Sequence, residues 1–218
     1  MTVCTVNKTN DVANVQRTLA IAFADSAPCH YLNKKFQDIP TSKQLSDEEL
    51  YGTYRTFCED FQARGGFLLE SNNFDCVAIV LPPQDKPAKT ARTQDPRFNE
   101  QFIDTIARHK EALGLGTKVK YYYLFMIGKN LEQPEVRGSA RAVLTYLKQK
   151  ADEQDAAVVL EAINDKAKKV YEYFGFVDYA DVNYGQGDVD SNGQPDPNGK
   201  GFVLNLMVYY KGGKLPIK

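Results

Sequence analysis

Apolar residues recur along the chain with two periods, one typical of helices and one typical of strands. After the polar cluster Thr9-Asn10-Asp11, apolar residues recur at helical spacing up to Phe23, which predicts a helix. A second helix is predicted over 46–63, because Ser46 and Glu49 have the spacing of a capping box. One face of it carries Leu50, Tyr54, Phe57 and Phe61. We interpret this aromatic stripe as core rather than as a binding surface.

The segment between these two helices is expected to be irregular. Asp25, Ser26 and Pro28 interrupt the first helix. Residues 33–43 are polar and contain Pro40, so we interpret them as a loop.

Two apolar runs around a polar turn predict a β-hairpin within residues 67–81. Residues 84–97 are polar and contain proline, which indicates an exposed loop. Apolar residues at helical spacing then predict an amphipathic helix over 98–113.

The stretch 118–176 organises the rest of the chain. An apolar run predicts a strand over 118–128, and a polar loop leads from it into a helix over 138–150. A second apolar run, AAVVLEAI, predicts another strand. A short helix then begins at Asn164 and stops before Phe176.

The chain ends with a predicted pair of strands around a long polar tip, over 177–182 and 202–210. Within the tip, Asp188-x-Asp190-x-Asn192-Gly193 is similar to the first half of an EF-hand loop. Gly199 stands where the twelfth-position Glu of such a loop is required. We therefore interpret this segment as a solvated hairpin tip and predict no metal site.

A strand that enters a helix through small residues can bind an anion. The first amides of a helix have no internal partner and form the positive end of the helix dipole. Gly138, Ser139 and Ala140 carry little or no side chain, so a phosphate can approach their backbone closely. The alternative is that these small residues serve packing alone.

The whole stretch 118–176 resembles the acetyl-CoA-binding core of the GCN5-related N-acetyltransferases, the GNAT superfamily. Their cofactor loop reads Gln/Arg-x-x-Gly-x-Gly/Ala, and Glu135-Val136-Arg137-Gly138-Ser139-Ala140 matches its last three positions. Glu135 departs from the pattern. Downstream, Leu160-Glu161-Ala162 falls where the family's fifth strand reads Leu-Glu-Ala. The following helix matches the family signature at Asn164, Ala167, Val170, Tyr171, Gly175 and Phe176.

This resemblance implies a set of site residues. The expected cofactor-binding residues are Met126, Ile127, Val136, Arg137, Gly138, Ser139, Ala140 and Asn164. In the family, the loop amides hold the pyrophosphate of coenzyme A, and the backbone of the central strand pairs with the pantetheine. Tyr171 falls at the position of the general acid that protonates the departing thiolate.

The resemblance also implies the fold, which is a GNAT fold of the α/β (α+β) class. Its central sheet is mixed, mostly antiparallel and flanked by helices. We expect a single acetyltransferase domain over 1–218, with its cofactor core at 118–176.

Composition excludes several other classes of protein. The 218 residues include 27 basic and 28 acidic ones, so no basic excess indicates nucleic acid and no charge asymmetry indicates a membrane surface. No apolar run reaches ~18 residues, so we expect no membrane span. The four cysteines are Cys4, Cys29, Cys58 and Cys76. Their wide spacing indicates reduced thiols in a cytoplasmic protein.

The implied activity is acetyl-CoA-dependent transfer of an acetyl group to a primary amine. The near-neutral charge of the chain and the predicted helix over 98–113, which the minimal core of the GNAT family lacks, favour a small-molecule amine. The general base stays open among Asp25, Glu70, Tyr122, Tyr123 and Glu161, and each of them has an alternative structural role. His30 either faces the substrate or lies on the surface.

Two other functions compete with acetyl transfer. A phosphate-binding enzyme of another class would need a Lys-Ser/Thr after the loop, and this sequence has none there. A non-catalytic acyl-CoA-binding or interaction module with the same fold is the main alternative. The oligomeric state stays open, although related enzymes are often homodimers.

Overall fold

The computed structural model of the protein describes residues 4–84 and 91–216. These residues form two compact units, and each contains both strands and helices. The first unit comprises the described parts of 1–24, 45–83 and 121–158, and the second comprises those of 25–44, 84–120 and 159–218. The mixed α/β class expected from the sequence is confirmed.

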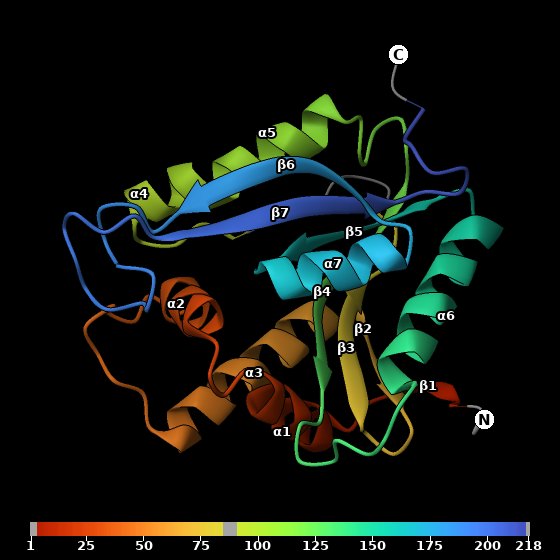
Figure 1. The fold of residues 1–218 in the computed structure, drawn as a ribbon, viewed down its shortest axis with the longest axis horizontal. Coiled ribbons are helices and arrows are strands. Elements are labelled where there is room, and N and C mark those ends of the chain that lie inside the picture. The colour runs from red at the N-terminus through yellow and green to blue at the C-terminus, as the bar shows by residue number, and fades with distance from the viewer. Residues whose placement is uncertain (1–3, 85–90, 217–218) are drawn as a thin grey trace. The chain divides into compact units, whose positions relative to one another are not determined.

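The first unit is a sheet covered by helices on both faces. Its elements are β1 (Val6–Thr9), α1 (Val12–Ala22), α3 (Asp47–Ala63), β2 (Phe67–Ser71), β3 (Cys76–Leu81), β4 (Tyr121–Lys129) and α6 (Ser139–Glu153). The strands lie in the order β1-β2-β3-β4, and each neighbouring pair is antiparallel. Helices α1 and α3 lie side by side against one face, and α6 covers the other (Figure 1).

Local side-chain caps begin α1 and α3 at the helix starts expected from the sequence. The carboxylate of Asp11 accepts a hydrogen bond from the Asn14 amide at 3.0 Å and starts α1. Ser46 and Glu49 form the predicted capping box at the start of α3, with hydrogen bonds in both directions. Such caps satisfy amides that the helix itself leaves unbonded, which explains why both helices start there.

The second unit holds the remaining elements. They are α2 (Ala27–Phe36), α4 (Pro96–Phe98), the π-helix η1 (Asn99–Asp104), α5 (Thr105–Ala112), α7 (Asp165–Tyr173), β6 (Val177–Tyr184) and β7 (Phe202–Tyr209). Strand β5 (Ala157–Ala162) begins in the first unit and continues into the second. The order here is β5-β7-β6, and β6 pairs with β7 in antiparallel fashion. Apolar side chains of α2, α4, η1, α5, β6 and β7 form one core cluster.

Helix α2 corrects the sequence prediction. Residues 25–28 were expected to interrupt the helical pattern, and 33–43 to form a loop. Instead, Ser26 is the N-cap of a helix that runs to Phe36, and its hydroxyl accepts a hydrogen bond from the Cys29 amide. Pro28 is tolerated because it lies in the first turn, where its missing N–H would have no helical partner.

The amphipathic helix predicted over 98–113 is confirmed, and it has a π-helical segment in its first half. Thr105 donates its hydroxyl hydrogen to the Glu100 carbonyl five residues earlier, at 2.9 Å. Phe98, Phe102, Ile103 and Ile106 all point into the core cluster. Of the loop predicted before this helix, residues 85–90 lie outside the described residues. No helix within 4–84 and 91–216 is both long and apolar enough to cross a bilayer.

Candidate functional site

The central strand β4 carries two of the expected cofactor residues. Met126 and Ile127 are half-buried and lie opposite Ile79 and Ala78 of β3. Successive residues of a strand turn their N–H and C=O groups to opposite edges. One of these two residues therefore directs its backbone toward β3, and the other directs it away from β3.

The loop after β4 ends at a glycine that starts a helix. Gly138 is the N-cap of α6, and its φ of 97° lies in the left-handed region that favours glycine. No side chain caps the first turn of this helix, whose residues begin with Ser139 and Ala140. The helix start therefore presents backbone amides and the positive end of a helix dipole beside an exposed arginine, Arg137.

This arrangement fits the pyrophosphate of coenzyme A. An ideal Cβ built on Gly138 would meet only the Cys4 sulfur, at 3.5 Å, and that sulfur also lies 3.6 Å from the Arg137 carbonyl oxygen. Val136 is half-buried, and the side chain of Glu135 is exposed. The residues 136–140 would hold the anion through their amides.

Ser139 shows a partner that the sequence did not indicate. Its side chain is buried, and its hydroxyl donates a hydrogen bond to the carboxylate of Asp75. Asp75 ends the turn between β2 and β3, and Lys129 at the end of β4 also contacts its carboxylate. No sequence motif indicated Asp75 or Lys129. Asp75 lies far from the loop motif 135–140 in the sequence, and Lys129 stands before this motif begins.

The remaining two site residues lie on α7, in the second unit. Asn164 is the N-cap of α7, and its side-chain oxygen accepts a hydrogen bond from the Ala167 amide at 2.8 Å. Tyr171 is half-buried in the last turn of the helix, and its ring lies 5.6 Å from that of Phe176. The cofactor loop, Met126 and Ile127 belong to the first unit.

The two buried carboxylates weighed as general bases both have partners. Glu70 accepts hydrogen bonds from the Asn7 side chain at 2.6 Å and from the Phe74 amide at 3.2 Å. Glu161 lies 2.9 Å from the ammonium of Lys110, and both side chains are largely buried. These contacts give both carboxylates a structural role.

The other candidate bases differ in their surroundings. Burial raises the pKa of the Tyr122 phenol, despite an opposing hydrogen bond with Gln154, so this group stays protonated at neutral pH. Tyr123 is half-buried, and its ring lies 6.3 Å from that of Phe61. Asp25 is exposed. None of these contacts distinguishes Asp25 or Tyr123 as the base.

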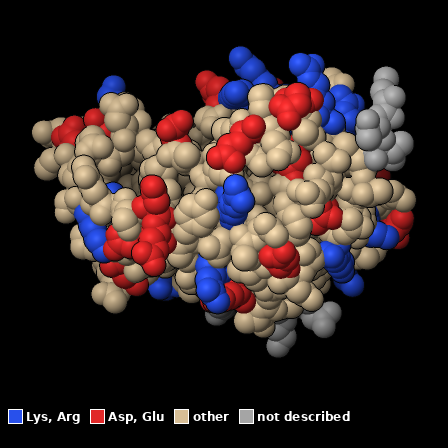
Figure 2. Space-filling model, turned by 90° about the horizontal axis from the view of Figure 1, so that it is seen from below, with Lys and Arg blue, Asp and Glu red and all other residues tan. Residues whose placement is uncertain are grey.

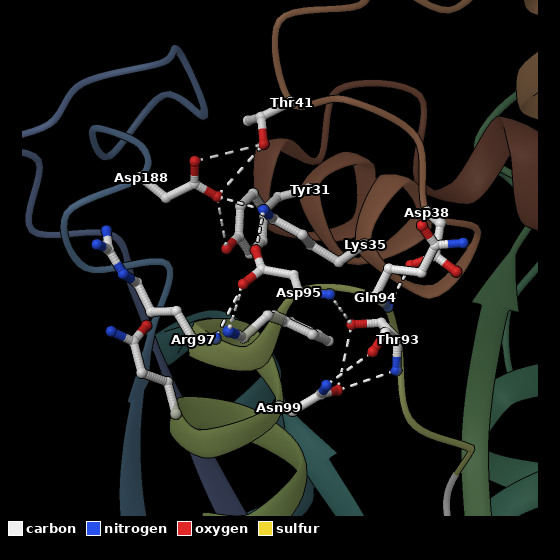
Figure 3. Close-up of polar contacts among 12 residues, drawn as sticks. Tyr31, Lys35, Asp38, Thr41, Thr93, Gln94, Asp95, Arg97, Asn99 and Asp188 are labelled. Carbon is white, nitrogen blue, oxygen red and sulfur yellow. Dashed lines mark hydrogen bonds and ion pairs between the residues drawn. The ribbon is translucent and has the colours of Figure 1, made fainter.

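A polar cluster in the second unit holds the segment between β6 and β7 (Figure 3). The ammonium of Lys35 lies 2.6 Å from Asp188 and 2.7 Å from Asp95. The hydroxyl of Tyr31 donates to Asp188 at 3.1 Å. We call Tyr31, Lys35, Asp95 and Asp188 the Lys35 cluster. It ties α2 to the start of α4 and to the β6–β7 segment.

The EF-hand-like motif 188–193, which was expected to be a solvated hairpin tip, forms hydrogen bonds and an ion pair within the protein. Its first residue, Asp188, belongs to the Lys35 cluster and is only partly exposed. Asp190 accepts hydrogen bonds from the amides of Asn192 at 2.8 Å and Gln194 at 2.9 Å, which is an Asx-turn. Among the described residues, no three His, Cys, Asp or Glu side chains are grouped so that they could hold a metal ion.

Charges of both signs are mixed on the surface. On the face drawn in Figure 2, acidic and basic side chains lie interspersed. Exposed ion pairs such as Arg55–Glu59 and Arg92–Asp104 follow the same pattern. Such a surface lacks the single-signed stripe typical of nucleic-acid binding on the face that is drawn.

Comparison with known proteins finds relatives by sequence and, separately, solved structures of similar fold. The sequence relatives are as follows. A family model described as the YOR012W acetyl transferase domain matches residues 7–86. The Saccharomyces cerevisiae protein YDR391C is 43% identical over 217 residues, which cover 99% of this chain and 91% of the yeast protein.

Solved structures share the fold at low sequence identity. The Corynebacterium glutamicum protein described as histone acetyltransferase HPA2 and related acetyltransferase aligns with a TM-score of 0.59 at 18% identity, over 95% of this chain and 96% of its own. The polyamine N-acetyltransferase of Drosophila melanogaster, which forms N-acetylagmatine, aligns with a TM-score of 0.57 at 11% identity. That match covers 95% of this chain and 100% of the fly chain.

Proposed function

The chain belongs to the GNAT superfamily, in one family with the yeast protein YDR391C, and from this premise we propose that it transfers the acetyl group of acetyl-CoA to the primary amine of a small molecule. The proposal takes residues 1–218 as one acetyltransferase domain. The four cysteines are free thiols, which suits the reducing cytoplasm that we propose as its location.

One observation carries the proposal. Gly138 has a left-handed φ of 97° directly at the N-terminus of α6, and no side chain caps this helix. A non-glycine residue would be strained at this position, and the uncapped first-turn amides are the groups that hold a pyrophosphate in a GNAT enzyme. The cofactor-binding set of the proposal is Met126, Ile127, Val136, Arg137, Gly138, Ser139, Ala140 and Asn164.

The proposed chemistry is direct transfer in a ternary complex. Acetyl-CoA supplies the acetyl group as an activated thioester. A free alkyl amine has a pKa of about 10.4, so a base or an ordered water must take its proton before it can attack. A backbone amide of β4 stabilises the negative charge that develops on the carbonyl oxygen. Tyr171 holds, on its phenol oxygen, the proton that the departing sulfur takes up.

A small amine is favoured over a protein as acceptor. The fly enzyme that shares this fold forms N-acetylagmatine. In this chain, the helical segment 96–112 and the long β6–β7 segment add structure beyond the minimal acetyltransferase core, and such additions can shape a closed site. The Lys35 cluster holds the β6–β7 segment in place, which favours one fixed shape over an open surface.

Acetyl-CoA binding measured by calorimetry tests the proposal. The wild type is expected to bind, and Gly138→Glu is expected to lose binding, because the new side chain is strained and its carboxylate repels the pyrophosphate. Gly65→Glu is the matched control, since Gly65 also has a left-handed φ, of 82°, and open space around it, at the end of α3. Absence of wild-type binding would overturn the proposal.

Turnover separates the proposal from its alternative. Wild-type protein with acetyl-CoA is assayed by thiol release against agmatine, an arylalkylamine and a peptide with a free N-terminus. Acetylation of a small amine in preference to the peptide supports the proposal. Tight coenzyme A binding without turnover of any amine would instead assign the chain to the non-catalytic acyl-CoA-binding modules.

A further inference from the structure

The turn between β2 and β3 is unusually constrained. Asn72, Asn73 and Phe74 all have positive φ, between 55° and 63°. The amide of Phe74 donates to the Glu70 carboxylate at 3.2 Å, and its carbonyl accepts from the Thr18 hydroxyl at 2.9 Å. Left-handed non-glycine residues persist only where neighbouring contacts hold them. The residue that follows, Asp75, is therefore delivered in one fixed position.

Asp75 is connected to both ends of the pyrophosphate loop, residues 130–138. At the start of the loop, its carbonyl accepts the Asn130 amide hydrogen at 2.6 Å, and its Oδ1 lies 3.2 Å from Lys129 Nζ. At the end of the loop, its Oδ2 accepts the hydroxyl hydrogen of Ser139, the first residue of α6. The side chain of Asp75 is 0% exposed. One buried residue thus joins the two points between which the loop runs.

Lys129 arranges the carbonyl groups of the same loop. Besides Asp75, its ammonium contacts the carbonyl oxygens of Asn130 at 3.1 Å and Gln133 at 3.0 Å. A carbonyl oxygen that faced the ligand would repel an anion, so an anion site must present amides and turn its carbonyls elsewhere. Lys129 draws these two carbonyls to itself.

The charges in this network also balance. A lone carboxylate at the N-terminus of α6 would compete with a phosphate for the helix dipole. The ammonium of Lys129 compensates the charge of Asp75 at close range. Together, Asp75 and Lys129 hold the loop in place, and their opposite charges add no net charge beside the anion site.

We infer that Asp75 is a positioning residue for coenzyme A: through Ser139 and Lys129 it holds the loop 130–138 in the form that binds the pyrophosphate. This inference rests on the proposed function and deepens it. Asp75 does not touch the ligand in this scheme, and it acts only through the loop.

The test compares coenzyme A with pantetheine, which lacks the pyrophosphate. Asp75→Asn and Ser139→Ala are each expected to weaken coenzyme A binding about tenfold, the equivalent of one hydrogen bond to a charged group. Pantetheine affinity is expected to stay at the wild-type value, because pantetheine makes no contact with this loop. A general loss of stability would not change the ratio of the two affinities.

Thr53→Val is the matched control. It removes a buried hydroxyl that donates to the Leu50 carbonyl at 2.7 Å within α3, and it leaves the contacts of the β2–β3 turn and of Asp75 intact. It is expected to lower the melting temperature as the other variants do and to keep the wild-type ratio of affinities. An equal loss of coenzyme A binding in Thr53→Val would overturn the inference.

The other outcomes are also decisive. If wild type binds coenzyme A and both Asp75→Asn and Ser139→Ala keep the wild-type ratio of affinities, the inference fails while the proposed function stands. If wild type binds no coenzyme A, the proposed function fails, and the inference fails with it. Should Asp75→Asn not fold, Ser139→Ala decides alone, since it removes only one hydroxyl group.

Discussion

Lys35 Nζ lies 2.6 Å from Asp188 Oδ2, an ion pair that joins α2 to the segment between β6 and β7. The same ammonium lies 2.7 Å from Asp95. The side chain of Lys35 is only 10% exposed, so this cation is held inside the protein by two carboxylates. Removal of the Lys35 ammonium would leave the carboxylates of Asp95 and Asp188 without the cation that now lies between them.

Lys35→Met is therefore expected to destabilise the protein by about 3 kcal/mol, the cost of breaking a buried ion pair on one side. Urea unfolding followed by circular dichroism measures this loss. The control is Arg55→Met, which removes an ion pair whose side chains are 65% and 54% exposed. That change should cost less than about 1 kcal/mol. Equal losses in the two variants would contradict a buried role for Lys35.

The same cluster predicts a pH dependence. Desolvation disfavours the charged form of Asp95, but hydrogen bonds from Lys35 and from the amides of Phe98 and Arg97 outweigh it and lower the pKa of this carboxyl. For Lys35, desolvation is likewise outweighed by Asp188 and Asp95, and the pKa is raised. Asp95 thus adds stability above its ordinary pKa of 3.8, and this stability is lost as the pH falls through the lowered value.

The difference in unfolding free energy between wild type and Lys35→Met should accordingly shrink in acid. Protonation of Asp95 removes the attraction in the wild type and relieves the uncompensated charge in the variant. Unfolding curves at about pH 7, 5 and 3 measure this difference. A difference that stays constant down to the lowest pH would show that the ion pair does not contribute.

Tyr171→Phe is expected to lower kcat about 100-fold, the lower range for loss of a general acid, while acetyl-CoA affinity is unchanged. The variant keeps the aromatic ring that packs 5.6 Å from Phe176, so the helix should stay in place. Steady-state kinetics with an amine found in the screen measures the effect. Tyr173→Phe on the same helix is the control, because Tyr173 is 71% exposed. Unchanged turnover in Tyr171→Phe would remove this tyrosine from the mechanism.

Gly128→Ala is expected to destabilise the first unit by about 2 kcal/mol through overpacking. An added Cβ would lie 2.9 Å from the Ala22 methyl group and 3.1 Å from Leu19 Cδ2, where α1 crosses β4. Ala22→Gly alone should cost about 1 kcal/mol, from its helix propensity. The double variant should lose less than the sum of the two, because the clash is relieved. Thermal unfolding of the three variants checks this; strict additivity would argue against the close contact.

Much of the local structure could be predicted from the sequence. The helix starts predicted at Thr9-Asn10-Asp11, Ser46 and Asn164 are confirmed, and at each a side chain accepts a hydrogen bond from the amide three residues later. The hairpin of β2 and β3 and the final pair β6 and β7 are confirmed as well. Helix α2 was missed because Ser26 and Pro28 were interpreted as breakers, whereas both suit the first turn of a helix.

The roles of Tyr171, Asn164 and the loop 136–140 came from the family resemblance and stay predictions. The structure adds the left-handed φ of Gly138 at an uncapped helix start, which suits an anion, and it adds the buried hydrogen bond from Ser139 to Asp75. The structure also shows that Glu70 contacts Asn7 and that Glu161 contacts Lys110. These contacts favour a structural role for both carboxylates over the role of general base.

Apart from α2, the sequence by itself determined the main helices and strands, the starts of α1, α3 and α7, and the position of the glycine at the start of α6. These features depend on periodicity and on hydrogen bonds between residues a few positions apart, so they can be recognised along the chain. Only the tertiary structure decided that Asp75 joins both ends of the pyrophosphate loop and that Lys35 lies between Asp95 and Asp188. Such contacts join residues that are distant in the sequence, and no spacing encodes them; they arise when packing of the elements buries charged groups that then require a partner.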